Sequence, residues 1–326
     1  MPPPDPASEP PPVERRVAKI ADGFITVTAD VPREPAGPKA TIIGPVVDPQ
    51  ALLAAGAIVV QFRVNWELLS GFAPKTPGQA PTAPTGHAVG KWLLAAPTAK
   101  TVGQGWFGFI AYNGGDAMRQ VVDHLLTIPD VDPSRLAIAG SSTGGFTALE
   151  AIVNEPRIKV AAVLSACGDY FDFLHRSTLA MEGKPLDLDA KYAATLRARQ
   201  PIAHPKRVTH AALLMVHGRR DLVVPFSCAR RTAAVFRRAY AKAGAPERFR
   251  FVVLPDEGHG LDAEGRRAIL AWWRRWLSLP IPEDPAPAVT SALRPVAPHP
   301  ERPQRLGDER AVAAHDLALG YGDRAP

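Results

Sequence analysis

The stretch Arg135-Leu-Ala-Ile-Ala-Gly140-Ser141-Ser142-Thr143-Gly144-Gly145-Phe146 joins an apolar run of strand length to a helix-forming segment. Within it, Gly140, Ser142 and Gly144 fit the pattern G-x-S-x-G, which is typical of a sharp strand-to-helix turn with a raised serine. Glycine suits such a turn because Cβ atoms have no room beside the serine and strained dihedral angles cost glycine least. The turn also places Ser142 at a helix N-terminus, which favours negative charge. We predict that Ser142 is a nucleophile whose attack creates an oxyanion, with a loop that carries no chemistry as the alternative.

Strand-like and helix-like segments alternate on both sides of this turn. The pattern predicts a mainly parallel central sheet with helices on both faces, an α/β fold. We expect a helix that is capped by Asp116. Its periodicity places on one apolar face Met118, Val121, Val122, Leu125 and Leu126. Strands are expected at 17–31 (one or two, with a turn near Asp22-Gly23), 40–44, 57–64, 158–165, 211–216 and 248–254, and further helices at 49–55, 226–242 and 263–277.

Proline-rich ends and two long connections define the expected domain limits. Residues 1–16 are predicted to be a disordered N-terminus, 17–279 one domain, and 280–326 a proline-rich C-terminal tail. Residues 67–108 form an unusually long loop, and 166–206 are expected to be an inserted lid or acyl pocket. The aromatic side chains of Tyr170, Phe171 and Phe173 are candidate substrate-pocket residues, although they can equally form the core of a lid.

Composition excludes several classes of function. The net charge is +6, but arginine pairs such as Arg230-Arg231 lie in segments of helical periodicity, and no nucleic-acid-binding module is recognisable. No apolar segment is long enough to span a membrane, and residues 1–6 show no secretory signal. The two cysteines, Cys167 and Cys228, make no disulfide framework, which favours a reducing compartment and hence the cytoplasm. We expect no cofactor, no metal, no nucleic acid and no membrane partner; the oligomeric state is left open.

A serine nucleophile needs a base, and the base needs an acid that orients it. In the elbow architecture these residues follow in the order Ser, Asp or Glu, His, each beyond the carboxyl end of a later strand. Asp221 follows the strand 211–216, and His259 follows the strand 248–254. The rivals are less well placed: His204, His210 and His217 do not follow the last strand, and Asp256 and Glu257 are too close to His259 in sequence. His217 is expected to brace the turn that holds the acid.

Three motifs resemble those of the α/β-hydrolase superfamily, within it most the dienelactone hydrolases and the catalytic domains of prolyl oligopeptidases. They are Gly140-Ser-Ser-Thr-Gly-Gly-Phe, His217-Gly-Arg-Arg-Asp-Leu-Val-Val-Pro and Glu257-Gly-His-Gly, and the resemblance covers about residues 17–279. Two departures matter: dienelactone hydrolases generally carry cysteine at the elbow, and this length cannot hold the β-propeller of an oligopeptidase. The resemblance implies an oxyanion hole formed by the N–H of Thr143 and a second donor after residue 44. Pro45 has no N–H, which leaves Val46 or a side chain from another loop.

The sequence therefore predicts a serine hydrolase that cleaves a small carboxylic ester through an acyl-enzyme, with Ser142, Asp221 and His259 as the triad. An ester is favoured over an amide because nothing in the sequence marks a clamp for a peptide backbone. Two alternatives stay open: a peptidase or amidase that uses the same triad, and a non-catalytic binding protein of the same fold.

Overall fold

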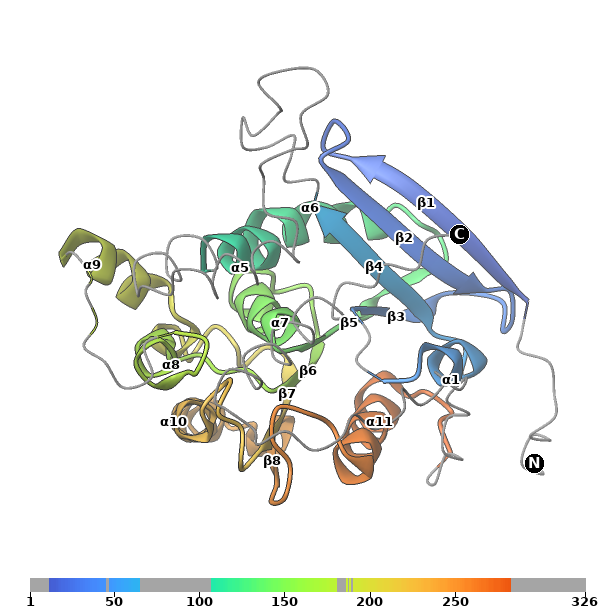
Figure 1. Ribbon diagram of the computed structural model, residues 1–326. Coiled ribbons are helices and arrows are strands. Elements are labelled where there is room, and N and C mark those ends of the chain that lie inside the picture. Colours follow the sequence, from blue (N-terminus) through green and yellow to red (C-terminus); the bar gives the residue numbers. More distant parts are fainter. Residues whose placement is uncertain are drawn as a thin grey trace, which may run out of the picture.

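An eight-stranded sheet in the order β1-β2-β4-β3-β5-β6-β7-β8 forms the centre of the molecule (Figure 1). The computed structural model describes residues 12–44, 47–64, 107–180, 186, 188 and 190–282. Predictions for Val46, for most of the loop 67–108 and for most of both proline-rich ends lie outside these residues. The strands are β1 (Val13–Ile20), β2 (Ile25–Pro32), β3 (Lys39–Ile43), β4 (Ile58–Val64), β5 (Val131–Ser141), β6 (Val160–Leu164), β7 (Ala212–Gly218) and β8 (Phe249–Leu254).

The sheet is parallel from β4 to β8, whereas β1 and β2 add an antiparallel hairpin at one edge. The predicted turn at Asp22-Gly23 joins these two strands, and both residues have positive φ. Because the strands from β4 to β8 run in the same direction, their carboxyl ends lie at one edge of the sheet. The segments that follow β5, β7 and β8 are therefore neighbours in space although they are far apart in sequence.

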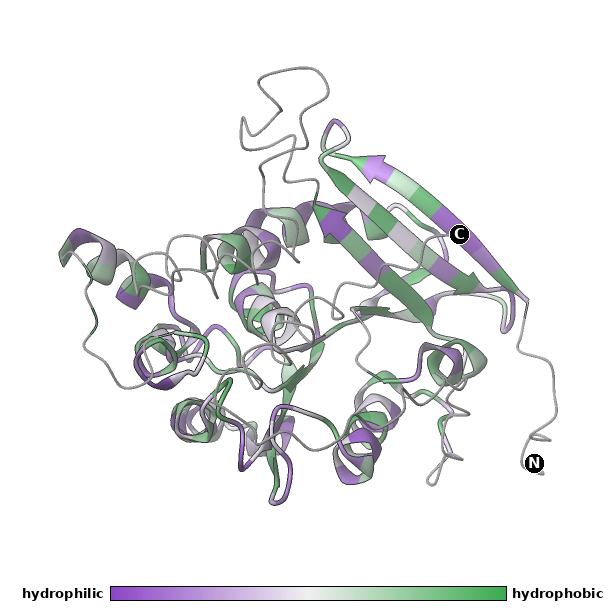
Figure 2. Cartoon of the chain, viewed as in Figure 1, coloured by the Kyte–Doolittle hydropathy of each residue, from purple (hydrophilic) through white to green (hydrophobic). Residues whose placement is uncertain are grey.

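Helices cover both faces of the sheet (Figure 1). One apolar cluster joins the sheet to α1 (Pro49–Ala54) and α11 (Ala263–Leu277), and the other joins it to the remaining large helices. Along β5, Leu136 and Ile138 belong to one cluster and Ala137 and Ala139 to the other, as the strand period of two requires. Strand residues are consequently apolar on both faces in the centre of the sheet, while charged residues appear on β1 at the edge (Figure 2). The helices on the face opposite α1 and α11 are α5 (Gly108–Tyr112), α6 (Met118–Leu125), α7 (Thr143–Asn154), α8 (Tyr170–Arg176), α9 (Ala190–Arg199) and α10 (Phe226–Lys242).

The ordered domain is longer at both ends than the sequence indicates. Strand β1 begins at Val13, which pairs with Pro32 of β2, so the expected limit at residue 17 is four residues too late. Charged residues hide this strand from a search for alternating polarity, because it lies at the edge of the sheet and is largely exposed, and Arg15 forms an ion pair with Asp30, its cross-strand partner on β2. At the other end Ile281 is buried against the α11 face, although Pro280 was the predicted start of the tail.

The helix that was expected to begin at Asp116 begins earlier, at Gly108. Helix α5 continues through a π-helical turn, η2 (Asn113–Ala117), directly into α6. Asp116 lies inside this run and forms an ion pair with Arg119, so the prediction that it caps the helix is wrong. A glycine such as Gly114 is unfavourable inside a helix. In the fold it allows a close contact between helices, because a Cβ there would lie 2.4 Å from the Cβ of Glu150 on α7.

The predicted apolar face of this helix is otherwise correct. Met118, Val121, Val122 and Leu125 are fully buried, whereas Leu126, just past the helix end, is 37% exposed. Among the described helices none is long and apolar enough to cross a membrane.

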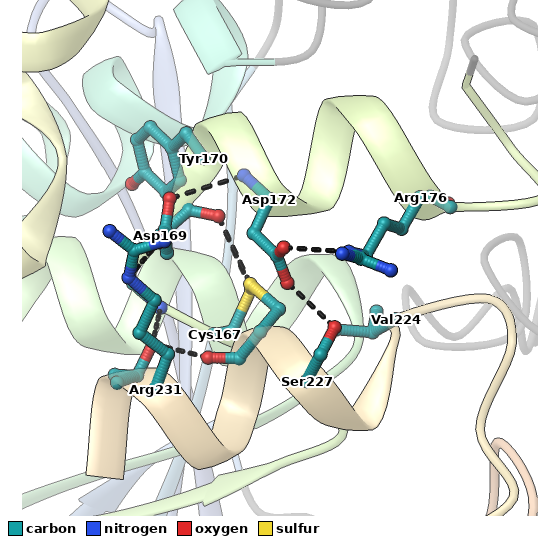
Figure 3. The surroundings of a disulfide bond; sticks show 12 residues. Cys167, Asp169, Tyr170, Asp172, Arg176, Val224, Ser227 and Arg231 are labelled. Carbon is teal, nitrogen blue, oxygen red and sulfur yellow. Dashed lines mark hydrogen bonds and ion pairs between the residues drawn. A yellow bond between two sulfur atoms is a disulfide. The ribbon is translucent and has the colours of Figure 1, made fainter. Parts of the chain in front are cut away.

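A disulfide bond joins Cys167, in the loop after β6, to Cys228 near the start of α10 (Figure 3). The sequence analysis saw no disulfide framework in these two cysteines and therefore missed this bond, and its argument from them for a reducing compartment no longer holds. Both residues are fully buried. The 61-residue separation carries no local signal, because only the packing of α10 beside the segment after β6 brings the sulfur atoms together.

Polar contacts surround the disulfide and join α8 to α10 (Figure 3). The Ser227 hydroxyl donates to the Asp172 carboxylate at 2.7 Å, and the Arg231 guanidinium lies 3.0 Å from the carboxylate of Asp169, the N-cap of α8. Deeper in, the N–H of Gly168 donates to the hydroxyl of Thr232 at 2.8 Å. The first part of the predicted insertion is thus anchored to α10.

Removing the disulfide should destabilise the protein without changing its fold. The double variant Cys167→Ser, Cys228→Ser is expected to lose about 2–4 kcal/mol of unfolding free energy, because the cross-link restricts the unfolded chain. Urea unfolding of both proteins measures the loss, and peptide mapping without reductant should recover the two cysteine peptides linked. An unchanged unfolding free energy, or unlinked peptides, would contradict the assignment.

Candidate active site

The turn between β5 and α7 carries Ser142 in a strained conformation. Its φ of 53° and ψ of −121° lie outside the regions that ordinary residues prefer. Neighbouring backbone holds this conformation: the Ser142 N–H donates to Leu164 of β6, and its carbonyl accepts the N–H of Phe146, both at 3.0 Å. Such strain persists only where the surrounding structure over-determines it, and it is concentrated at functional sites.

Close contacts explain some of the glycines around Ser142. A Cβ on Gly140 would lie 2.0 Å from the carbonyl oxygen of Gly144, and a Cβ on Gly145 would lie 2.7 Å from the Cβ of Ala166. Gly144 itself has nothing within 4 Å of the same position. The argument that Cβ atoms have no room is therefore correct for Gly140 and extends to Gly145, but it does not apply to Gly144.

Asp221 and His259 meet Ser142 at the carboxyl edge of the sheet. His259 lies between β8 and α11; its Nε2 is 2.9 Å from Ser142 Oγ, and its Nδ1 is 2.8 Å from Asp221 Oδ2. Asp221 lies between β7 and α10, and its other oxygen, Oδ1, accepts the N–H of Val224 at 2.8 Å. The structure thus brings together the three residues that the chain order Ser, Asp, His singled out.

The partners of His259 decide where its protons lie. An ionised carboxylate only accepts hydrogen bonds, so Nδ1 carries the hydrogen that is donated to Asp221. In the neutral imidazole, Nε2 is then the acceptor for the Ser142 hydroxyl. Asp221 is 2% exposed and Ser142 7%, so water competes little for these hydrogen bonds. The arrangement can remove a proton from Ser142 and stabilise the positive charge that develops on the ring.

His217 supports the turn that holds Asp221, as the sequence led us to expect. Its Nε2 donates to the carbonyl of Val224 at 2.8 Å and lies 3.5 Å from Asp221 Oδ2. The ring is fully buried, and burial lowers its pKa, an effect that the nearby Asp221 charge only partly offsets. His217 is therefore neutral near pH 7, with its proton on Nε2.

The rival residues lie elsewhere. The rings of His204 and His210 bind backbone carbonyls of Ala198 and Arg207. The Asp256 carboxylate forms an exposed ion pair with Arg220.

The loops of Asp221 and His259 are packed directly on each other. A Cβ on Gly218, the last residue of β7, would lie 2.0 Å from the carbonyl oxygen of Gly258. The N–H of Arg220 also donates to the carbonyl of Glu257 at 2.9 Å. Gly218, the glycine of the His-Gly-Arg-Arg-Asp motif, is thus needed so that the loop that carries His259 can pack against the end of β7.

The predicted oxyanion residues are described only in part, and the predicted pocket residues differ in burial. Thr143 is the first residue of α7, directly after Ser142, while Val46 lies outside the described residues. Tyr170 and Phe173 are each 1% exposed and pack with Phe146 of α7. This burial agrees with the alternative that they form the core of a lid. Phe171 is half-buried, with the guanidinium of Arg197 4.9 Å from its ring centre.

One buried acid was missed by the sequence analysis. Glu150 is 4% exposed on α7 and accepts a 2.5 Å hydrogen bond from the hydroxyl of Tyr170, which also lines the cavity beside it. A single glutamate in a helix carries no sequence signal of burial, since glutamate is ordinarily a surface residue.

The neutral state of His217 has a measurable consequence. An unfolded histidine titrates near 6.5, and burial lowers the pKa of His217 below that in the folded protein. The unfolded state therefore binds the extra proton first, and stability should fall as pH drops below about 6.5. His217→Asn keeps a donor for Val224 but cannot titrate, so its unfolding free energy should decline less between about pH 7 and pH 5. Urea unfolding across this range compares the two, with His204→Asn as the control; parallel curves for all three proteins would refute the assignment.

Comparison with known proteins identifies hydrolases of similar sequence or fold. The Bacillus subtilis (strain 168) protein named "Putative esterase YitV" is 23% identical over 153 residues, which cover 45% of this chain and 59% of that protein. A puromycin-hydrolyzing peptidase of Mycobacterium tuberculosis has 18% identity and a TM-score of 0.54, covering 82% of this chain and 40% of that one. TT1662 from Thermus thermophilus has 21% identity and a TM-score of 0.52, covering 82% of this chain and 98% of that one.

The acylaminoacyl peptidase of Pyrococcus horikoshii has the same fold, with 16% identity, a TM-score of 0.53 and coverage of 81% of this chain and 42% of the peptidase. The chain thus spans 59% of its curated relative and about two fifths of each of these two peptidases. These structures, at such identities, establish an α/β-hydrolase-like fold. Residues 113–279, just over half of the chain and including Ser142, Asp221 and His259, match the prolyl oligopeptidase family. The chain belongs to the prolyl oligopeptidase family of serine hydrolases.

Proposed function

We propose that this protein hydrolyses small carboxylic esters through an acyl-enzyme on Ser142. The observation that carries the proposal is the continuous set of hydrogen bonds from Ser142 Oγ through His259 to Asp221, with distances of 2.9 and 2.8 Å. In a non-catalytic binding protein nothing would require a strained serine, a neutral imidazole and a buried carboxylate to lie in this order.

The chemistry follows from where each proton lies. His259 Nε2 takes the hydroxyl proton of Ser142 as Oγ attacks the ester carbonyl, and Asp221 stabilises the imidazolium that forms. The imidazolium then protonates the leaving alcohol, and the acyl group remains on Oγ. Water then attacks the acyl carbon as His259 takes one of its protons, the bond to Oγ breaks and the acid is released, and the imidazolium returns the proton to Ser142 Oγ. The N–H of Thr143, at the N-terminus of α7, is our proposed donor to the oxyanion, and Val46 is the proposed second donor.

An ester substrate is supported by the name of the Bacillus subtilis relative and by the absence of a sequence feature that marks a peptide-backbone clamp. The second candidate, a peptidase or amidase that uses the same triad, is supported by the family itself and by the peptidases among the structural relatives. This chain spans about two fifths of those peptidases.

A substrate panel separates the two candidates. We expect the purified protein to hydrolyse p-nitrophenyl esters of short acyl chains and to be labelled by a fluorophosphonate, while aminoacyl-anilides are cleaved far more slowly. Ser142→Ala should lose both turnover and labelling because it removes the attacking oxygen, and Ser141→Ala should keep them. Faster cleavage of anilides than of esters would favour the peptidase, and an unlabelled wild-type serine would overturn both catalytic proposals.

The role of Asp221 has its own test. Asp221→Asn preserves shape but removes the charge that steadies the imidazolium, so kcat/KM on one activated ester should fall by about a hundredfold or more. Asp256→Asn is the matched control, because that carboxylate is exposed and bound to Arg220, and it should cost less than about tenfold. A near-normal Asp221→Asn enzyme beside a crippled Asp256→Asn enzyme would break the proposed triad.

A further inference from the structure

A cavity of about 240 Å³ lies against the middle of α7. Its walls combine the aromatic rings of Phe107, Tyr170 and Tyr192 with Leu196 of α9. Two charged side chains, Glu150 from α7 and Arg199 from the end of α9, complete the walls. The cavity therefore offers an apolar surface and one group of each charge.

Glu150 enters this cavity as a buried acid that has no cation partner among the described residues. Tyr170 Oη donates to its Oε1 at 2.5 Å and Asn154 Nδ2 donates to its Oε2 at 3.2 Å. Within the described part of the chain no basic nitrogen lies within 4.0 Å of either oxygen, and burial raises the pKa of the group. Each oxygen can accept a second hydrogen bond, so a ligand cation would find free acceptors and would offset the cost of burial.

Arg199 is the opposite charge in the same cavity. Its guanidinium has no carboxylate within 4.0 Å among the residues that the structure describes. It is near enough to Glu150 for its charge to favour the ionised carboxylate, yet the two do not form an ion pair. Opposite charges that face one cavity without touching leave space for a molecule that carries both signs.

Helix α9 is weakly packed over this space. Leu196 is its only buried side chain, although the helix spans ten residues. A larger, polar cavity of about 390 Å³ lies beside the first and shares Gly108, Ala111, Glu150 and Arg199 with it. A ligand in the smaller cavity would supply apolar contacts that α9 lacks.

This cavity is separate from the triad. Glu150 follows Thr143 by seven residues on α7, which is about 10 Å along the helix axis. Phe146 lies between them on the same face, four residues from both Ser142 and Glu150. Its ring packs with those of Phe107 and Tyr170, so an aromatic cluster separates the cavity from Ser142.

We propose that this cavity binds a free α-amino acid with an apolar side chain, in its zwitterionic form. The ammonium group lies against Glu150, the carboxylate against Arg199, and the side chain among the rings of Phe107, Tyr170 and Tyr192. The site is independent of the proposed esterase activity, because its residues take no part in the triad.

Three probes that share one ring test the requirement for both charges. Calorimetric titration near pH 7 of L-phenylalanine, 2-phenylethylamine and 3-phenylpropanoate should give the tightest binding for phenylalanine, by about tenfold or more over either analogue, because each analogue leaves one charged group unpaired. If phenylalanine does not bind, or if either analogue binds as tightly, the proposal is overturned.

Variants locate the site. Glu150→Gln and Arg199→Gln should each weaken phenylalanine binding by about tenfold or more, and each should remove the preference over the analogue that lacks the matching charge. Arg197→Gln is the control, because this residue is on the same helix but stacks on Phe171 outside the cavity, and its binding should equal that of the wild type. Arg199 is exposed, so Arg199→Gln remains a test even if Glu150→Gln does not fold. Wild-type affinity in folded Arg199→Gln would refute the site.

Discussion

A carboxylate taken fully out of water must have all its hydrogen bonds supplied by protein, and Asp221 sets this constraint at the carboxyl edge of the sheet. The N–H of Val224 and the ring of His259 supply these bonds. The Val224 N–H can reach Asp221 only if the segment after β7 folds back. His217 holds that segment through a hydrogen bond to the carbonyl of Val224. The contact between Gly218 and Gly258 then brings the histidine loop within reach. Loss of one of these contacts would weaken or remove one of the two hydrogen bonds that the buried Asp221 carboxylate accepts.

The helices on the same side of the sheet are tied to this edge. Helix α10 begins a few residues after Asp221, and the disulfide between Cys228 and Cys167 joins it to the segment that follows β6. Ser227 and Arg231 extend the connection to the acidic N-terminal turn of α8. The serine turn packs on the same segment, because a Cβ on Gly145 would contact Ala166. The acid loop, the nucleophile turn and the first helix of the insertion therefore form one connected body.

Helix α7 links the two sites that we propose. Its N-terminus receives the strained Ser142, and its face continues through Phe146 to Glu150. The close approach of Gly114 to Thr147 and Glu150 packs this part of the helix directly against η2. An acid held in this way is a cost to stability unless a partner offsets it, and Arg199, which has no carboxylate partner among the described residues, is the reason why we propose a partner with both charges.

Local patterns in the sequence were enough to predict the alternation of strands and helices, the turn at Ser142 and the order of Ser142, Asp221 and His259. Each depends on short-range chemistry: the period of apolar residues, the space that glycine leaves in a turn, and the rule that parallel strands end at one edge. The family follows from the same residues.

Contacts between distant segments could not be predicted in this way. The pairing of Cys167 with Cys228, the early start of α5, the strand at Val13 and the burial of Glu150 all depend on which elements lie side by side. Gly114 shows the reason: in sequence it reads as a helix break, while in the fold it is the place where one helix touches another. Packing determines the meaning of such residues, and packing is a property of the whole chain.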